Sequence, residues 1–514
     1  MSKKQIKIGA ILSYVSIIIN IIAGLLYTPW MINEIGKSQY GLYTLANSLI
    51  TLFLMDFGLG SATTRYVSKY RAEGNKEKVN NFLGVIYKLY LIIDTIIFTI
   101  LLILFFCLDK IYVNLTPNEI EQFKVVYVIS ALFAVFHFPF ITQNGILTAY
   151  EKFIPLKLAD IFYRFLLIGF TIVALLLGYG LYALVTVHAF VGILVVIYKF
   201  IVLKFSVPTK ANWKYSDKSL YKDIFSFSIW VTVAALAQRL IFNITPTILG
   251  ITVNTAAIAI FGVITTIEGY TYTFTTAING MFMPKISKAY VEDENNESIE
   301  CRAEKKIQPL FLNVGRFQYA LNGLIIVGFT VIGKQFIDLW MGIEYTDAYL
   351  GILLVIIPGL FFNSLQIANT ALVVRNKVKI QALVNVVCGI INVILSFVLS
   401  YFIGVIGSCI SIFITYMIRA VAINVIAKKV LKFDINQFIK KCYIRMSIPM
   451  LLSVLIALII NYFIPNTGWL MFICQGVIVV LVYFLLMLLF GISKEERKSC
   501  FNIIKNKLSR RKIR

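Results

Sequence analysis

Residues 82–107 read FLGVIYKLYLIIDTIIFTILLILFFC, and only Lys88 and Asp94 in this stretch carry a charge. As a helix the stretch would be about 39 Å long, more than the roughly 30 Å of hydrocarbon in a bilayer. Lipid offers no hydrogen-bond partners, so the backbone N–H and C=O groups there must bond to one another, within a helix or a closed barrel. Because the sequence lacks the alternating pattern of barrel strands, this stretch predicts a transmembrane helix.

Similar runs recur from one end of the chain to the other. Of 514 residues, 59% are hydrophobic and 14% are charged, whereas soluble proteins average roughly a quarter charged residues. About fourteen spans are expected, at residues 10–31, 40–63, 82–107, 122–147, 153–177, 181–203, 225–250, 257–284, 314–333, 349–372, 380–401, 405–427, 447–464 and 469–491. The predicted fold class is therefore an all-α integral membrane protein.

The distribution of basic residues predicts the orientation of these spans. Lys and Arg number 48 and Asp and Glu 25, a formal net charge of +23. Thirty-seven of the basic residues lie at the N-terminus, in the even-numbered loops and in the C-terminal tail, whereas three lie in the odd-numbered loops. Cytoplasmic segments carry the excess of Lys and Arg, so both termini are expected in the cytoplasm. The basic tail, with Arg510 and Arg511, suits anionic lipid headgroups rather than nucleic acid.

Weak internal similarities predict two related halves. Thr28-Pro29 matches Thr245-Pro246, Ser68 to Tyr70 matches Ser287 to Tyr290, and Gly180 matches Gly404, at offsets of 217, 219 and 224 residues. Each half has six expected spans, so the copies would enter the membrane in the same orientation and share a cavity between them.

This repeat gives the expected domains. They are an N-terminal lobe at residues 1–204, a cytoplasmic connector at 205–224, a C-terminal lobe at 225–427 with a cytoplasmic linker at 285–313, two appended spans at 428–491, and a basic cytoplasmic tail at 492–514.

Five stretches carry a family resemblance. They are Gly36 to Tyr43 (GKSQYGLY), Asp56 to Leu59 (DFGL), Ala62 to Tyr66, Pro284 to Tyr290 (PKISKAY) and Phe336 to Ala348 (FIDLWMGIEYTDA). Through them the chain resembles bacterial polysaccharide flippases of the Wzx type, in the multidrug/oligosaccharidyl-lipid/polysaccharide exporter (MOP) superfamily. The resemblance implies a V-shaped fold of two six-helix lobes plus two extra C-terminal helices, alternating between inward-open and outward-open states.

The resemblance also implies a function and a location. The expected substrate is a polyprenyl-diphosphate-linked oligosaccharide, moved from the cytoplasmic to the outer leaflet of a bacterial cell membrane. Its product would serve surface polysaccharide assembly, as O-antigen, capsule or a teichuronic-type polymer, with polymerase machinery as a partner. No cofactor is expected beyond a coupling Na⁺ or H⁺, and the sequence has no GxxxxGK[ST] phosphate loop.

Ionisable groups near mid-membrane are functional candidates, because each costs at least about 2.5 to 3.5 kcal/mol at a helix centre. Arg239 lies deep in the expected span 225–250, and its guanidinium suits a diphosphate because it donates two parallel hydrogen bonds. The alternative is a structural ion pair with Glu268. Glu268 lies among hydroxyls that suit sugars, including Tyr270 and Tyr272, and either neutralises Arg239 or takes up a coupling proton or Na⁺.

Three further carboxylates are candidates for the coupling ion. Asp160 and Arg164 lie one helical turn apart, so they either pair with each other or serve coupling and substrate binding respectively. Asp94 has no obvious local partner in its span. Asp56 belongs to the DFGL stretch and either lines the cavity or supports helix packing.

The remaining cationic candidates lie near the expected cytoplasmic ends of spans. Lys88 and Arg419 either bind substrate or extend to the headgroups, as long side chains do. Arg65 and Arg375 end two spans on that side, where they either form a basic entrance for an anionic lipid head or fix the topology.

No catalytic or metal-binding residues are expected, because the sequence has no HExxH or GxSxG motif and only two histidines, His137 and His188, to which we assign structural roles. Three alternatives to a polysaccharide flippase remain. A cation antiporter of the same superfamily would favour acidic groups in its site, and a glycan polymerase or ligase would need a long outer loop. A flippase for the peptidoglycan precursor is not distinguished by sequence.

Overall fold

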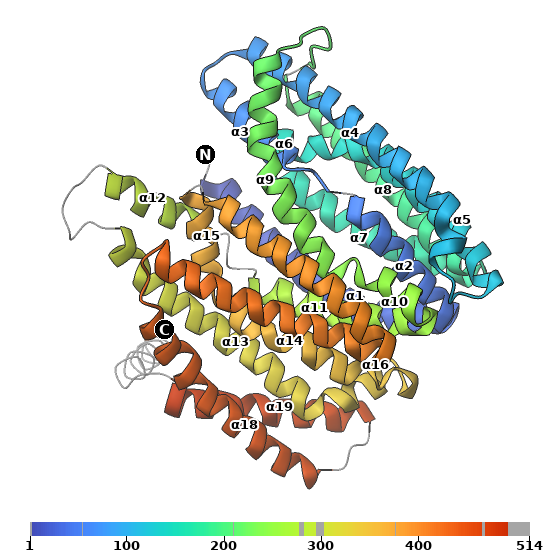
Figure 1. Cartoon of the computed structure of the whole chain (residues 1–514), viewed down its shortest axis with the longest axis vertical. Coiled ribbons are helices and arrows are strands. Elements are labelled where there is room, and N and C mark those ends of the chain that lie inside the picture. Colours follow the sequence, from blue (N-terminus) through green and yellow to red (C-terminus); the bar gives the residue numbers. More distant parts are fainter. Residues whose placement is uncertain are drawn as a thin grey trace, which may run out of the picture. The chain divides into compact units, whose positions relative to one another are not determined.

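The computed structural model describes residues 3–53, 55–208, 210–276, 282–294, 303–375, 377–464 and 468–491, and the regular structure in these segments is entirely helical (Figure 1). Ten helices there are long and apolar enough to cross a membrane. The pair α14 (Ala348–Asn363) and α15 (Gln366–Val374), bent by 54°, would be an eleventh span. The all-α membrane fold is confirmed, whereas the number fourteen stays a prediction.

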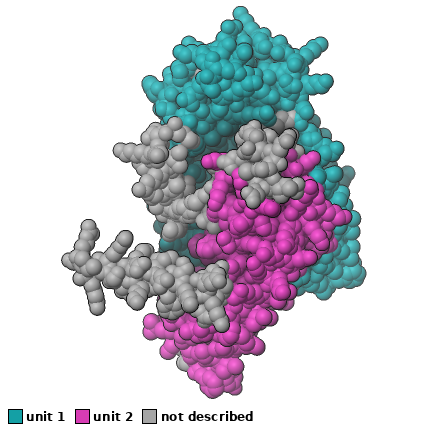
Figure 2. All heavy atoms as spheres, turned by 90° about the vertical axis from the view of Figure 1, so that its left-hand side faces the viewer, with its two compact units in different colours: residues 1–265, 378–415 teal, residues 266–377, 416–514 magenta. Residues whose placement is uncertain are grey.

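Two compact units make up the chain (Figure 2): Met1–Thr265 with Val378–Thr415, and Thr266–Lys377 with Tyr416–Arg514. The lobes expected at 1–204 and 225–427 stay a prediction. The expected tail at 492–514 lies outside the described residues, as does part of the expected linker.

Unit 1 is a helical bundle. Its elements are α1 (Lys3–Ile35), α2 (Lys37–Phe53), α3 (Leu59–Ala72), α4 (Lys76–Ile111), α5 (Pro117–His137), the 3₁₀ turn η1 (Phe138–Ile141), α6 (Thr142–Ala149), α7 (Phe153–Leu176), α8 (Gly180–Ser206), α9 (Lys218–Phe242), α10 (Thr245–Thr252), the start of α11 (Thr255–Thr276) and α16 (Val378–Lys429) as far as Thr415. Helix α7 packs against α1 and α8, and α5 packs against α2, α4 and α8. Figure 1 shows α4, α5 and α8 side by side.

The expected span 40–63 is wrong as a single helix, because the chain turns between α2 and α3. Phe57 and Gly58 have positive φ angles of 49° and 70°. The Asp56 carboxylate accepts a hydrogen bond from the Gly58 backbone N–H at 3.0 Å, which stabilises the turn. The DFGL stretch is therefore a helix break, and Asp56 supports it.

Two other expected spans, 122–147 and 225–250, are interrupted beside prolines, whereas the reversal at Gly404 falls between the expected spans 380–401 and 405–427. Helix α5 ends just before Pro139, and α10 begins beside Pro246, since a proline has no N–H to donate to the preceding turn. In α16 the chain reverses at Gly404, whose φ is 58°. Beyond it Ser408 accepts a hydrogen bond from Ser396 at 3.0 Å, as expected for two antiparallel arms. Gly180 opens α8 with a similar φ of 54°.

A carboxylate joins three helices of unit 1 near the start of α5. Glu119 accepts hydrogen bonds from the hydroxyls of Ser38 at 2.5 Å and Thr255 at 2.6 Å. Its other oxygen accepts from the Thr116 backbone N–H at 2.9 Å and completes a capping box. Next to Ser38, Gly41 permits the approach, because a Cβ there would overlap with the Thr255 carbonyl.

We predict that Glu119→Ala lowers the free energy of unfolding by about 1–3 kcal/mol, because two hydroxyls and a helix cap lose a charged acceptor. The measurement is the denaturation midpoint of the purified protein in detergent. Glu121→Ala is the matched control, since Glu121 is exposed on the same helix. Equal midpoints for the two variants would contradict the role of Glu119.

Unit 2 is centred on one long helix. Its elements are the end of α11, α12 (Met283–Glu294), α13 (Ala303–Trp340), η4 (Ile343–Tyr345), α14, α15, the rest of α16, α17 (Ile435–Phe438), the π-helical turn η5 (Ile439–Ile444), α18 (Arg445–Tyr462), α19 (Gly468–Leu486) and η6 (Met487–Gly491). Helix α13 packs against α14, α18 and α19. Its buried Asn322 accepts a hydrogen bond from Asn363 of α14 at 3.2 Å, and Asn363 also donates to Thr275 of α11 at 3.3 Å.

Candidate functional site

A cavity of about 380 Å³ lies within unit 1, lined by residues of α1, α5, α7 and α8. Its ionisable lining residues are His137 of α5, Asp160, Tyr163 and Arg164 of α7, and His188 and Lys199 of α8. Arg164 and Asp160 are two of the sequence-predicted site residues, and the fold brings them together with both histidines of the chain.

Aromatic packing forms one wall of the cavity. Gly192 lets α8 approach α5, because a Cβ there would overlap with the Phe133 ring. The Phe133 ring then lies between the two histidines, at 5.4 Å from His137 and 5.6 Å from His188 between ring centroids. Tyr163 meets His188 edge to face at 5.9 Å. The histidines are thus held in place, in agreement with structural roles, yet both line the cavity.

Arg164 provides an available cation in this cavity. Its Nε–H is buried and has no hydrogen-bond acceptor, and none of the ion pairs among the described residues includes it. Three tyrosines, Tyr27, Tyr43 and Tyr163, lie within electrostatic range of the guanidinium. Neutral hydroxyl groups leave its charge uncompensated, so the site favours an anionic ligand.

The expected pair of Asp160 with Arg164 is wrong. Asp160 pairs with Lys157, one turn earlier in α7, at 3.2 Å between Nζ and Oδ2. Because Lys157 already neutralises the carboxylate, Arg164 and Lys199 give the cavity a positive balance. Sequence reasoning missed Lys199 as a candidate, although it lies within the expected span 181–203 and, in the structure, within α8.

Arg239 has a partner in the fold of unit 1. Its Nη1 donates a hydrogen bond to the backbone carbonyl of Thr51, near the end of α2. The carboxylate of Asp56 lies within electrostatic range of the Arg239 guanidinium. Arg239 therefore supports the end of α2 before the turn at Phe57 and Gly58, and its contact with a substrate or with Glu268 stays a prediction.

Two other predicted residues of α4 have different surroundings. The Lys88 ammonium donates to the Tyr215 carbonyl at 2.9 Å and so holds the segment between α8 and α9. Asp94 is half-buried, and its Oδ1 has no hydrogen-bond partner within the described part of the chain. The role of Asp94 in binding a coupling ion stays a prediction.

In unit 2, three predicted residues lie in one region. Arg419 is only 5% exposed and lies over the rings of Phe362, at 4.2 Å, and Tyr416, at 5.6 Å. Its expected extension to the headgroups is wrong, because these rings stabilise the guanidinium inside the protein. Tyr272 lies within electrostatic range of both Glu268 and Arg419.

The last predicted residues are Arg375, Arg65 and Tyr270. Arg375 donates to the Val430 carbonyl at 2.9 Å and lies 5.5 Å from the ring of Tyr290. Arg65 is exposed on α3. Tyr270 is half-buried on α11, one residue from Gly269. No group of three or more metal-ligating side chains occurs among the residues that the structure describes.

Residues 6–290 match the model of a family described as polysaccharide biosynthesis protein. The chain belongs to this family. No curated protein sequence matches it.

Solved structures of transporters share the fold of this family member. The lipid II flippase MurJ, in an inward closed conformation, is 15% identical with a TM-score of 0.69, over 93% of this chain and 98% of that one. An inward-facing multidrug resistance MATE family transporter of the MOP superfamily is 14% identical with a TM-score of 0.65, over 82% of this chain and 99% of that one. A MOP superfamily transporter from Pyrococcus furiosus is 14% identical, with a TM-score of 0.59, over 81% and 93%.

These similarities confirm the predicted fold, which this polysaccharide biosynthesis family member shares with solved transporters of the MOP superfamily. The similar structures are those of a flippase and of transporters. The Wzx subtype stays a prediction.

The close approach of α5 and α8 gives a test of the cavity wall. Gly192→Leu should lower the free energy of unfolding by about 1–3 kcal/mol, because the added side chain must displace the Phe133 ring. Gly169→Leu on α7 is the control, since a Cβ there meets nothing within 4 Å. Denaturation midpoints of both variants decide the matter; an unaffected Gly192→Leu protein would contradict this packing.

Proposed function

We propose that the protein is a flippase that moves a polyprenyl-diphosphate-linked oligosaccharide from the cytoplasmic to the outer leaflet for surface polysaccharide assembly. The observation that carries the proposal is the positive balance of the cavity in unit 1. Arg164 and Lys199 line it, while its one carboxylate, Asp160, is paired with Lys157 outside the lining. A diphosphate is the group of this substrate that a buried guanidinium recognises best.

Different residues of the cavity suit different parts of this substrate. Arg164 has a donor available for a phosphate oxygen, and Lys199 adds a second positive charge on the facing helix. The hydroxyl of Tyr163 and the rings of Phe133 and Tyr163 suit the hydroxyls and apolar faces of sugars. An anion that enters this cavity loses hydrogen bonds to water. Charge-assisted hydrogen bonds to Arg164 and Lys199 replace them.

Two further features complete the proposal. A Na⁺ or H⁺ gradient drives the cycle, with Asp94 as the leading coupling site because one of its oxygens lacks a partner among the described residues. Glu268, Asp56 and Asp160 remain the other candidates. Polysaccharide polymerase machinery in a bacterial cell membrane would use the product.

The runner-up is a cation antiporter, which the MATE-like fold also accommodates. An organic cation requires an available carboxylate and aromatic faces in its site. The cavity in unit 1 offers aromatic rings, but two cations outnumber its single, already paired carboxylate. The charge balance therefore favours the flippase over the antiporter.

The experiment is deletion of the gene in its native host, complemented with variants of the full chain. Arg164→Gln should restore at most about a tenth of the wild-type surface polysaccharide and leave lipid-linked oligosaccharide at the inner leaflet, because a charge-assisted contact worth about 1.5–3 kcal/mol is lost. Arg164→Lys, which keeps the charge without the planar fork, should restore an intermediate amount.

Lys152→Gln is the matched control, since this cation lies just before α7 and outside the cavity lining. It should restore polysaccharide fully at equal expression. A deletion strain with normal polysaccharide and heightened sensitivity to cationic drugs would contradict the flippase and support the antiporter.

A further inference from the structure

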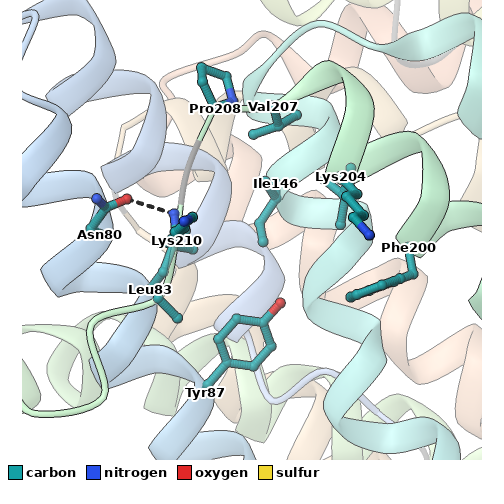
Figure 3. A pocket seen from close by; sticks show the side chains of 11 residues that line it. Asn80, Leu83, Tyr87, Ile146, Phe200, Lys204, Val207, Pro208 and Lys210 are labelled. Carbon is teal, nitrogen blue, oxygen red and sulfur yellow. Dashed lines mark hydrogen bonds between the residues drawn. The ribbon is translucent and has the colours of Figure 1, made fainter.

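A second cavity of unit 1, of about 590 Å³, lies beneath the segment that joins α8 to α9. Asn80, Leu83 and Tyr87 of α4 line one side, and Phe200, Leu203 and Lys204 of α8 line the other. Both sets have the three- to four-residue spacing of a single helix face. Figure 3 shows Tyr87, Ile146 and Phe200 around a common space, with Val207 and Pro208 across its top.

The segment above this cavity is firmly attached to α4. The Asn80 side chain accepts from the Lys210 backbone N–H at 2.9 Å (Figure 3), and the Asn80 carbonyl accepts from the Asn212 N–H at 2.9 Å. Gly84 permits this approach, because a Cβ there would overlap with the Asn212 carbonyl. Trp213 stacks on the Tyr87 ring at 5.8 Å. The cavity is thus enclosed by a segment that hydrogen bonds and ring stacking hold in place on α4.

Polarity changes with depth in this cavity. Its cations, Lys204 and Lys210, lie near the end of α8 and in the segment beyond it. One turn deeper, Phe200 lines the same cavity and is 56% exposed on a helix whose neighbouring Ile197 and Ile201 are also exposed. In a membrane such an apolar surface faces acyl chains, so the cavity opens from a cationic end onto a lipid-facing one.

We propose that this cavity binds an anionic phospholipid of the membrane leaflet on that side. Its phosphodiester lies between Lys204 and Lys210, and its acyl chains extend past Leu203 and Phe200 into the bilayer. Basic pockets between transmembrane helices recognise anionic headgroups in this way. No carboxylate lines the cavity among the described residues, so a zwitterionic lipid would place its ammonium group against two lysines without compensation. The proposal requires only that the chain spans a membrane and is independent of the transported substrate.

The test is native mass spectrometry of the purified full-length protein titrated with phosphatidylglycerol or with phosphatidylethanolamine of the same acyl chains. Wild type should retain phosphatidylglycerol with about tenfold preference. The double variant Lys204→Gln and Lys210→Gln should lose that preference, whereas Lys214→Gln, an exposed lysine of the same segment outside the lining, should keep it.

Leu203→Trp keeps both charges but fills the cavity, and it should weaken phosphatidylglycerol binding at least fivefold even where the double variant fails to fold. Glycerol 3-phosphate and inorganic phosphate separate a lipid site from a site for a soluble anion. Equal retention of the two lipids by wild type would overturn the proposal. So would binding of glycerol 3-phosphate as tight as that of the lipid, or unchanged lipid binding by Leu203→Trp.

Discussion

Hydrocarbon solvates neither a backbone amide nor a charge, and this constraint governs both the fold and the candidate sites. Every apolar run must form helix to satisfy its own peptide groups. Each charge within a helix must find a partner, a ring or water, because its cost at the bilayer centre is at least about 2.5 kcal/mol. Asp160 forms an ion pair with Lys157, and Lys88 donates a hydrogen bond to a carbonyl. Arg419 lies over the rings of Phe362 and Tyr416. Arg164 instead faces a cavity.

The same constraint explains where helices break. Backbone groups freed at a turn need new partners inside the protein, and two breaks in unit 1 have them nearby. The turn after α2 uses the Asp56 carboxylate, and Arg239 donates to the Thr51 carbonyl just before it. Asn392 donates to the carbonyl of Ile241 at 3.0 Å, near the end of α9. Polar side chains in such positions satisfy the fold first, which is why an intramembrane charge need not touch a substrate.

The sequence predicted the fold class well because hydrophobic length is a direct physical requirement of the bilayer. The helical spans and the superfamily follow from the apolar runs and from the GKSQYGLY and DFGL stretches. The positions of breaks were harder to predict. Residues 40–63 are long and mainly apolar with Asp56 as their only charge, and it is the positive φ angles of Phe57 and Gly58 that reveal the turn.

The candidate site was predicted only in part, because the sequence gives spacing along one helix but not the neighbours of that helix. Asp160 has cations at both i−3 and i+4, and spacing alone does not choose between Lys157 and Arg164. His137 comes from α5, whereas His188 and Lys199 come from α8, so their common cavity depends on the approach of these two helices at Gly192. Arg239, the sharpest candidate by sequence, proved to be tied to a carbonyl.

The central claim is that the cavity of unit 1 selects an anionic ligand. Its most direct test is equilibrium binding of a polyprenyl diphosphate and of a lipophilic organic cation to the purified protein, in wild-type form and as Arg164→Gln and Lys199→Gln. The account predicts that the diphosphate binds and the cation does not, and that each substitution weakens diphosphate binding about tenfold or more. Binding of the cation in preference to the diphosphate, unaffected by either substitution, would contradict it.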